Sequence, residues 1–200
     1  MDRFLHQRQA EGQGFAMVCG IDEAGRGPLA GPVCAAAVIL PLDCEIDGLD
    51  DSKKLSELKR EELFDVVIEK AISYGIGWAS EREIDEHNIL QATFLAMRRA
   101  LEAIQVTADY ALVDGNRMPL LSIPGETIVK GDSKCACIAA ASILAKVSRD
   151  RLLRELDKQY PEYGFAKHKG YGTKSHYETI KKHGILPVHR KSFLKNLHEK

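Results

Sequence analysis

The stretch that decides the fold is Met17–Leu40, which reads MVCGIDEAGRGPLAGPVCAAAVIL. It contains two short apolar runs, 17–22 and 33–40, whose composition favours β-strands. A glycine-rich loop joins the two runs, and the carboxylates of Asp22 and Glu23 stand where the first run meets that loop. The stretch therefore predicts two neighbouring strands. The loop that joins them has few side chains, and two acidic residues stand at its start.

Further along the chain, helices and strands alternate. Ser56 can cap a helix that leads into a third apolar run at 72–79. Ser80 and Glu83 match a capping box, and Asn88 repeats the capping pattern shortly afterwards. We expect the following helix to turn an apolar stripe towards the core, and the stripe comprises Leu90, Phe94, Met97, Leu101 and Ile104.

The second half of the chain adds two strand-like runs, 110–114 and 127–130, and a long helix expected over 133–159. The first half of that helix is rich in alanine, which permits close packing against a neighbouring element. Strands that alternate with helices predict an α/β fold, with a mixed sheet flanked by helices.

Three segments follow from these patterns. Residues 1–16 form a polar N-terminal leader, residues 17–160 the main domain, and residues 161–200 a basic extension. The extension is too short for a core of its own, so we expect it to fold onto the main domain.

Composition restricts the class of protein. The chain has 200 residues, of which 44% are hydrophobic, and this suits one globular domain. It has no membrane-length apolar run and no signal peptide at its start, so we expect a cytoplasmic protein without a membrane partner. The five cysteines are odd in number and sit mostly in apolar segments, which favours buried thiols over disulfides.

Charge is distributed unevenly along the chain. Residues 1–132 carry 13 Lys and Arg against 23 Asp and Glu, whereas residues 133–200 carry 15 against 6. Two solvated faces of opposite sign would explain this asymmetry. A basic region that binds a polyanion beside an acidic site that binds cations would explain it equally well.

Three apolar runs each end in carboxylates: Asp22 and Glu23 after the first, Asp114 after another, and Asp132 after a third. Acids at the ends of strands can converge at one edge of a sheet. Such a cluster raises its own pKa values unless a cation is present, and oxygen ligands alone suit Mg²⁺ or Mn²⁺. Any one of these acids alone would more often cap a helix or turn, so the repetition is what favours a metal-dependent phosphodiester hydrolase.

Two further stretches could contact a nucleic acid. In the glycine-rich loop, Gly25 and Gly27 leave the main chain open to a ligand, and Arg26 offers a donor fork for a phosphate. The stretch 167–176, KHKGYGTKSH, places Tyr171 among lysines and histidines. A simple turn and a solvated basic loop are the plain alternatives for these two stretches.

Six motifs between residues 20 and 173 are similar to those of bacterial ribonuclease HII, and the resemblance extends over residues 19–193. They are GIDEAGRGPLAGPVCAAAVIL at 20–40, DSKKLS at 51–56, VDGN at 113–116, KGDSK at 130–134, IAAASILAKVSRD at 138–150 and HKGYGT at 168–173. The resemblance implies a ribonuclease H-like fold with a C-terminal helical extension. It also implies an endoribonuclease that hydrolyses the RNA strand of RNA-DNA hybrids and incises at single ribonucleotides embedded in duplex DNA.

The resemblance also implies roles for individual residues. The family's four metal-binding carboxylates fall on Asp22, Glu23, Asp114 and Asp132, and two Mg²⁺ or Mn²⁺ ions are expected there during catalysis. The family's glycine-arginine-glycine element falls on Gly25, Arg26 and Gly27. Its main chain is expected to recognise the 2′-hydroxyl of the ribonucleotide.

The family's tyrosine falls on Tyr171, which should lie against the sugar of the next deoxynucleotide. The phosphate contacts expected from the resemblance are Lys53, Ser133, Lys146, Arg149, Lys169 and Thr173. The short leader and the aspartate at position 132 are closer to type II than to type III enzymes. The tail HGILPVHRKSF departs from the commoner glycine-proline version of this turn.

Other functions predict different behaviour. Another metal-dependent nuclease on the same scaffold would also cut duplexes made only of DNA. A non-catalytic binding module would bind equally well in EDTA, and a structural adaptor would leave the acidic strand ends unexplained. We expect a monomer, and the tail LKNLHEK at 194–200 carries no evident clamp-binding peptide.

Overall fold

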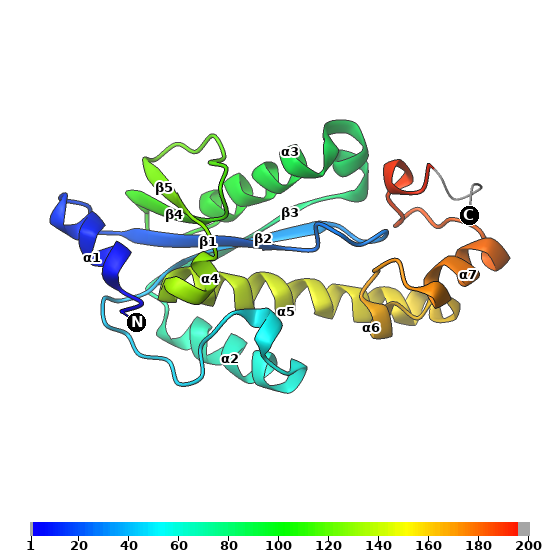
Figure 1. Ribbon diagram of the computed structural model, residues 1–200, viewed down its shortest axis with the longest axis horizontal. Helices are drawn as coiled ribbons and strands as arrows, with labels where there is room; N and C mark the ends of the chain where they lie inside the picture. Colours follow the sequence, from blue (N-terminus) through cyan, green and yellow to red (C-terminus); the bar gives the residue numbers. More distant parts are fainter. Residues whose placement is uncertain (1, 196–200) are drawn as a thin grey trace.

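Five strands form one mixed sheet in the order β3-β2-β1-β4-β5 (Figure 1). The computed structural model describes residues 2–195. The strands are β1 (Val18–Ala24), β2 (Val33–Ile39), β3 (Ser73–Ala79), β4 (Tyr110–Asp114) and β5 (Gly125–Ile128). β1, β2 and β3 pair antiparallel, whereas β1, β4 and β5 pair parallel. The predicted α/β fold with a mixed sheet is confirmed.

Helices cover both faces of the sheet (Figure 1). α2 (Glu57–Lys70) and α5 (Ala136–Gln159) pack on one face, and α3 (Glu81–Glu102) packs on the other. β2 is buried along its whole length because its alternate side chains enter the two cores. Ala36 and Val38 face α5, whereas Ala35 and Ala37 face α3.

Glycines bring the helices unusually close to the sheet. A Cβ atom at Gly20 of β1 would lie 2.2 Å from the carbonyl carbon of Cys137 in α5. A Cβ atom at Gly77 of β3 would lie 2.1 Å from the carbonyl oxygen of Ala96 in α3. The expected close approach of the alanine-rich half of α5 is thus confirmed.

Side-chain caps fix the starts of two helices where the sequence predicts them. Ser56 accepts a hydrogen bond from the N–H of Lys59 at the start of α2. Ser80 and Glu83 form both hydrogen bonds of a capping box at the start of α3. Asn88 interrupts α3 with φ at 68°, and its side chain caps the second part of the helix.

The interior of α3 differs from the expectation. Of the five stripe residues, only Met97 is fully buried, while Ala92, Ala96 and Ala100 form the face against the sheet. The reason is the close approach at the β3 glycines, which leaves room only for alanine. The larger stripe residues pack along the flank of the contact instead.

Three predicted element bounds also differ. β1 continues two residues beyond Asp22, because Glu23 and Ala24 pair with β2. β5 lies at 125–128 rather than 127–130. The long helix predicted over 133–159 begins at Ala136, since Cys135 is extended and separates α5 from the short α4 (Gly131–Lys134).

The C-terminal elements pack on the far end of α5. They are η2 (Pro161–Tyr163), α6 (Phe165–His168), α7 (Lys174–His183) and η3 (Lys191–Phe193). A small core that they share with the main domain includes Phe165 and Ile180, together with Leu153 of α5 and Leu29 of the β1–β2 loop. The extension therefore reaches the same loop that follows Asp22 and Glu23.

The remaining elements belong to the first third of the chain. α1 (Leu5–Gly12) packs near β1 and β4, and η1 (Ser52–Lys54) precedes α2.

All five cysteines are free thiols, and four are buried. Within residues 2–195, no helix is long and apolar enough to cross a membrane. Most of the tail at 194–200 lies outside the described residues.

Candidate active site

Asp22 and Asp114 lie on adjacent parallel strands and face the same side of the sheet. The register of β1 and β4 pairs Ile21 with Val113, so the next residues along the two strands are neighbours. Gly20, two residues before Asp22, faces α5. Because side chains alternate along a strand, Asp22 and Asp114 point towards α5 and the α4 turn ahead of it.

Asp132 reaches this region from α4. Its neighbour Gly131 donates its main-chain N–H to the Oδ1 of Asp114 at 2.6 Å, which ties the α4 turn to the end of β4. Asp132 is buried, as is Asp22, while Asp114 is half-buried. Glu23 lies on the other face of β1, and its N–H donates to the Oδ1 of Asp22 at 2.7 Å.

The charges of these acids act on one another. Burial raises the pKa of Asp22 well above its usual range, and the charges of Glu23, Asp114 and Asp132 raise it further. Burial also raises the pKa of Glu23 against the attraction of Arg26, with Asp114 adding to the rise. The structure therefore brings Glu23, Asp114 and Asp132 within electrostatic range of Asp22.

Asp132 has its own surroundings. Burial raises the pKa of Asp132, and the nearby charges of Asp114 and Asp51 add to the rise. The Nζ atom of Lys53 lies 3.7 Å from the Oδ2 of Asp132, and the Lys53 side chain is 79% exposed. Burial disfavours the charge on Lys53, but the surrounding acids outweigh it and raise the pKa of Lys53. Lys53 thus stands at the solvent side of the carboxylates.

The chemistry of this cluster fits a hard divalent cation. All its ligands are carboxylate oxygens, and mutual repulsion disfavours their ionised forms unless a cation is bound. No three His, Cys, Asp or Glu side chains within residues 2–195 are already arranged so that they could hold a metal ion.

The glycine-rich loop begins directly beside the acids. Arg26 lies 3.2 Å from the carboxylate of Glu23 through its Nη1 atom. Gly25 has φ at 94°, a conformation that favours glycine, and a Cβ atom there would clash with Arg149. A Cβ atom at Gly27 would lie 3.5 Å from the ring of Tyr171, which is 47% exposed. Tyr171 therefore borders the loop from the extension.

The residues expected to contact phosphates differ in how far their side chains are already engaged within the protein. Lys146 forms an ion pair with Asp150 at 2.7 Å. Lys169 donates to the carbonyl oxygen of Ala166 and lies 3.4 Å from Glu57, so both lysines already have partners within the chain.

Arg149 does not fit its expected role as a phosphate contact. It is 1% exposed, and its donors are occupied by the carbonyl oxygens of Pro32, Ala30 and Lys169. A sequence cannot distinguish a buried arginine that supports a loop from one that faces solvent, so the role of Arg149 towards a phosphate stays a prediction.

Two hydroxyl residues take part in local turns. Ser133 donates to the carbonyl oxygen of Lys130. Thr173 is exposed and caps α7 by accepting from the N–H of His176. These contacts leave both hydroxyl oxygens able to accept a further hydrogen bond. They do not orient either hydroxyl towards a ligand.

A cavity of about 370 Å³ adjoins the acids on the α3 side. Glu23, Arg26 and Asp114 line one wall, and Leu90 and Phe94 of α3 line another. Part of the apolar stripe that the sequence assigns to the core therefore borders the candidate site.

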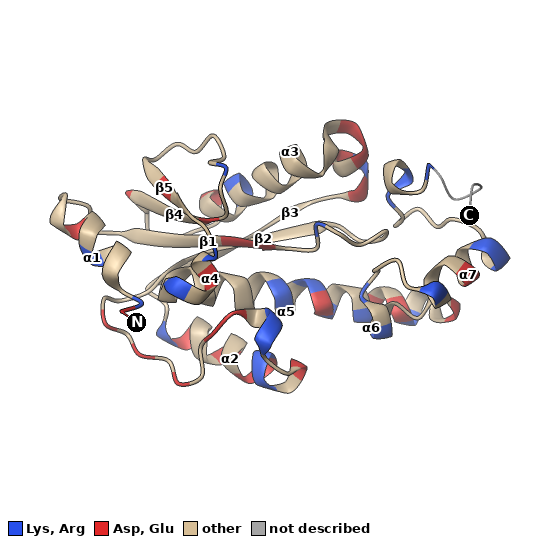
Figure 2. Ribbon diagram, viewed as in Figure 1, with Lys and Arg blue, Asp and Glu red and all other residues tan. Residues whose placement is uncertain are grey.

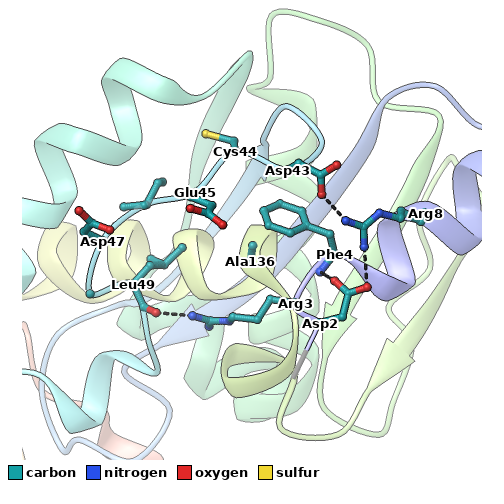
Figure 3. Close-up of a pocket in the computed structure, with 12 residues that line it drawn as sticks. Asp2, Arg3, Phe4, Arg8, Asp43, Cys44, Glu45, Asp47, Leu49 and Ala136 are labelled. Atoms are coloured by element: carbon teal, nitrogen blue, oxygen red, sulfur yellow. Dashed lines mark hydrogen bonds and ion pairs between the residues drawn. The ribbon is translucent and has the colours of Figure 1, made fainter.

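Sequence reasoning missed Arg3, which links the N-terminal segment to the site through the main chain of Asp132. Its guanidinium donates to the carbonyl oxygen of Leu49 and, at 3.0 Å, to that of Asp132. The carbonyl oxygen of Arg3 accepts from the N–H of Ala136 at the start of α5. Arg3, Leu49 and Ala136 also line a cavity of about 420 Å³ (Figure 3). An isolated arginine in a polar leader gives no signal of such a contact.

The charge asymmetry of the sequence is visible in the fold. Figure 2 shows acidic residues on β1, whose acids are Asp22 and Glu23 near its C-terminal end, and basic residues interspersed with acidic ones along α5 and α7. The extension, which is part of the basic stretch 133–200, packs against the glycine-rich loop at Leu29.

Comparison with known proteins identifies the family. A family model described as Ribonuclease HII matches residues 19–196. A ribonuclease HII from Endomicrobium trichonymphae is 59% identical over 191 residues, which cover 95% of this chain and 91% of that protein. The chain belongs to the ribonuclease HII family. It is accordingly an endoribonuclease of the ribonuclease H class, and metal dependence is general for ribonuclease HII.

Solved structures agree with the fold of a ribonuclease HII. The ribonuclease H2 of Pyrococcus horikoshii matches with a TM-score of 0.76 and 28% identity, covering 92% of this chain and 96% of that one. The structure of a PCNA:RNase HII complex from Archaeoglobus fulgidus matches with a TM-score of 0.69 and 28% identity, covering 88% and 94%. The fold expected from the resemblance to ribonuclease HII is confirmed.

Proposed function

We propose that this protein hydrolyses the RNA strand of RNA-DNA hybrids and incises at single ribonucleotides embedded in duplex DNA, leaving 5′-phosphate and 3′-hydroxyl ends. The observation that carries the proposal is the meeting of Asp22, Asp114 and Asp132, from three separate segments, beside a glycine-rich loop. Acids supply a cation site for phosphate chemistry, and an open main chain supplies a surface that can contact a sugar.

The residues that would hold the metal are Asp22, Glu23, Asp114 and Asp132, and Mg²⁺ or Mn²⁺ suits them, with two ions in place during catalysis. When bound, such ions activate water and stabilise the departing 3′-oxygen. The contribution of the chain is positional: the N–H of Gly131 orients the Asp114 carboxylate, and that of Glu23 orients Asp22. Burial of Asp22 and Asp132 keeps the site away from bulk water.

Substrate contacts are proposed for the residues around these acids. The main chain of Gly25, Arg26 and Gly27 would contact the 2′-hydroxyl of the ribonucleotide, because that group distinguishes RNA from DNA. Tyr171, exposed and adjacent to Gly27, would lie against the next sugar. Lys53, which stands at the solvent side of Asp132, would contact a phosphate.

The remaining proposals concern the whole chain. The chain is divided into a leader at 1–16, a catalytic domain at 17–160 and a basic extension at 161–200. In this division the basic extension provides most of the binding to the duplex. We also propose that the protein acts as a monomer in the cytoplasm.

The test uses a labelled duplex that carries one ribonucleotide and an identical duplex made only of DNA. We expect Mg²⁺-dependent cleavage next to the ribonucleotide in the first duplex, no cleavage of the second, and no product in EDTA. Cleavage of both duplexes would instead support a general nuclease. Binding without any product in Mg²⁺ would support a non-catalytic module.

A further inference from the structure

Arg190 is buried against the glycine-rich loop and donates only to main-chain carbonyl groups of that loop. Its side chain is fully buried. The Nη2 atom donates to the carbonyl oxygen of Gly25 at 2.6 Å, and Nη1 donates to that of Arg26 at 2.9 Å. The Nε atom donates to the carbonyl oxygen of Gly31 at 2.9 Å. One guanidinium thus holds both ends of the loop.

These hydrogen bonds determine which way two peptide units face. A trans peptide is planar, so its N–H points away from its C=O. No cis peptide bond occurs among the described residues. Because the carbonyls of Gly25 and Arg26 point inward to Arg190, the N–H groups of Arg26 and Gly27 point the opposite way. Residues 26 and 27 are exposed, and neither N–H has an acceptor within residues 2–195.

Arg190 is held in place by the rest of the tail. Its own N–H donates to the carbonyl oxygen of Leu29 at 2.8 Å, and its guanidinium lies over the ring of Phe193. Asp85 of α3 accepts hydrogen bonds from the N–H groups of Lys191 and Ser192. The side chain therefore has a fixed position from which to orient the loop.

The electrostatics of Arg190 differ from those of a simple structural ion pair. Among residues 2–195 no carboxylate lies within ion-pair distance of its guanidinium. A cation placed behind two carbonyls polarises their peptide units and strengthens the opposite N–H groups as donors. A guanidinium suits this role better than an ammonium because its planar fork can bind neighbouring carbonyls at once.

We propose that Arg190 is a positioning residue for selectivity, which orients the peptide units of Gly25, Arg26 and Gly27 so that two N–H groups form the receptor for the 2′-oxygen of a ribonucleotide. This inference rests on the proposed function of the loop. It assigns part of the enzyme's choice between RNA and DNA to the C-terminal segment, about 165 residues along the chain from the loop.

The test compares affinities in EDTA, where no cleavage occurs, for a duplex with one ribonucleotide and the same duplex made only of DNA. The variants are Arg190→Lys and Arg190→Gln, since both keep a donor at a buried site. We expect the ratio of the two dissociation constants to fall about tenfold towards one, as the loss of two aligned hydrogen bonds implies. The affinity for the DNA-only duplex should stay unchanged.

Arg149→Lys is the matched control, because Arg149 is equally buried and donates to carbonyls of Ala30, Pro32 and Lys169 rather than to the two reading peptides. Its stability should fall and its affinity ratio should persist. An unchanged ratio in folded Arg190 variants would overturn the inference. An equal fall of the affinity ratio in the Arg149 variant would also overturn the inference, because a general loosening of the loop would then explain both results.

A second measurement needs no variant. In the wild-type protein, the amide protons of Arg26 and Gly27 should exchange rapidly with solvent and become protected by the ribonucleotide duplex but not by the DNA-only duplex. Protection before any duplex is added would contradict the inference. Failure of the proposed function is distinct, since the wild-type protein would then not cleave at the ribonucleotide at all. A wild-type protein that cleaves there but binds both duplexes equally contradicts the inference alone.

Discussion

At the scale of single residues, Asp22 lowers the stability of the folded protein in order to serve the candidate active site. Burial and three neighbouring acids raise its pKa, so the ionised form destabilises the folded state. An asparagine in its place would keep the oxygen that accepts from the N–H of Glu23 without the charge. Such a trade of stability for activity is common where a site gathers like charges.

We therefore expect Asp22→Asn to raise the melting temperature in EDTA at pH 7 by roughly 2–4 °C, which corresponds to about 1 kcal/mol for a chain of this size. The sign follows from the raised pKa: the penalty exists above the unfolded-state pKa and disappears as the pH falls towards 4. Calorimetry at pH 7 and pH 4 checks both parts. A lower melting temperature for the variant at pH 7 would contradict this account of Asp22.

Prediction from sequence succeeds at this scale where a residue's role depends on its near neighbours. Ser56 and Ser80 cap helices as expected because a cap needs only the next turn of chain. Arg149 and Arg190 could not be assigned from sequence, since the carbonyls of Pro32 and Gly31 that they bind lie more than 100 residues away. The four candidate carboxylates were recognisable because each follows an apolar run, a pattern visible without knowledge of the fold.

At the scale of elements, the glycines of β3 set the distance between α3 and the sheet. A Cβ atom at Gly77 would lie 2.1 Å from the carbonyl oxygen of Ala96, so α3 would have to move outward. We expect Gly77→Ala to lower the free energy of unfolding by about 1–3 kcal/mol or more, as overpacking does. Urea denaturation measures this change.

Gly12→Ala is the matched control for that substitution. Gly12 ends α1, and a Cβ atom there would have no neighbour within 4 Å. The control should be neutral or slightly stabilising, because alanine favours helix more than glycine does. Equal effects of the two substitutions would show that the close approach of α3 does not limit stability.

Element boundaries were harder to predict than element types. The break at Cys135 depends on α4, which is fixed by the hydrogen bond from Gly131 to Asp114 in another part of the chain. The continuation of β1 past Asp22 depends on its pairing with β2. Neither contact is local, so the apolar pattern alone could not place these ends.

At the scale of the whole molecule, the two ends of the fold respond oppositely to acid. The extension contains a buried cluster of His168, His176 and His189, with the rings of His168 and His176 stacked at 4.3 Å. Burial lowers the pKa of all three, that of His176 to about 4. The unfolded chain therefore binds protons that the folded extension excludes between pH 6.5 and 4.

Acid should consequently loosen the extension before the sheet. We expect the amides of residues 163–190 to lose protection against hydrogen exchange between pH 7 and pH 5, after correction for the intrinsic rate. The strands β1 and β4 serve as the internal reference, because acid relieves repulsion among the carboxylates there. Protection that falls equally in both regions, or in neither, would show that the histidine cluster does not govern docking of the extension.

The central claim is that Asp22, Glu23, Asp114 and Asp132 act together as one cation-dependent site. The most direct measurement is the single-turnover rate of cleavage at one embedded ribonucleotide, across a titration of Mg²⁺, for the wild-type protein and the four carboxylate-to-amide variants. We expect each variant to lose about 100-fold or more at saturating Mg²⁺, whereas Asp65→Asn, on the exposed side of α2, should match the wild type. A wild-type rate from Asp22→Asn, Asp114→Asn or Asp132→Asn would contradict the claim.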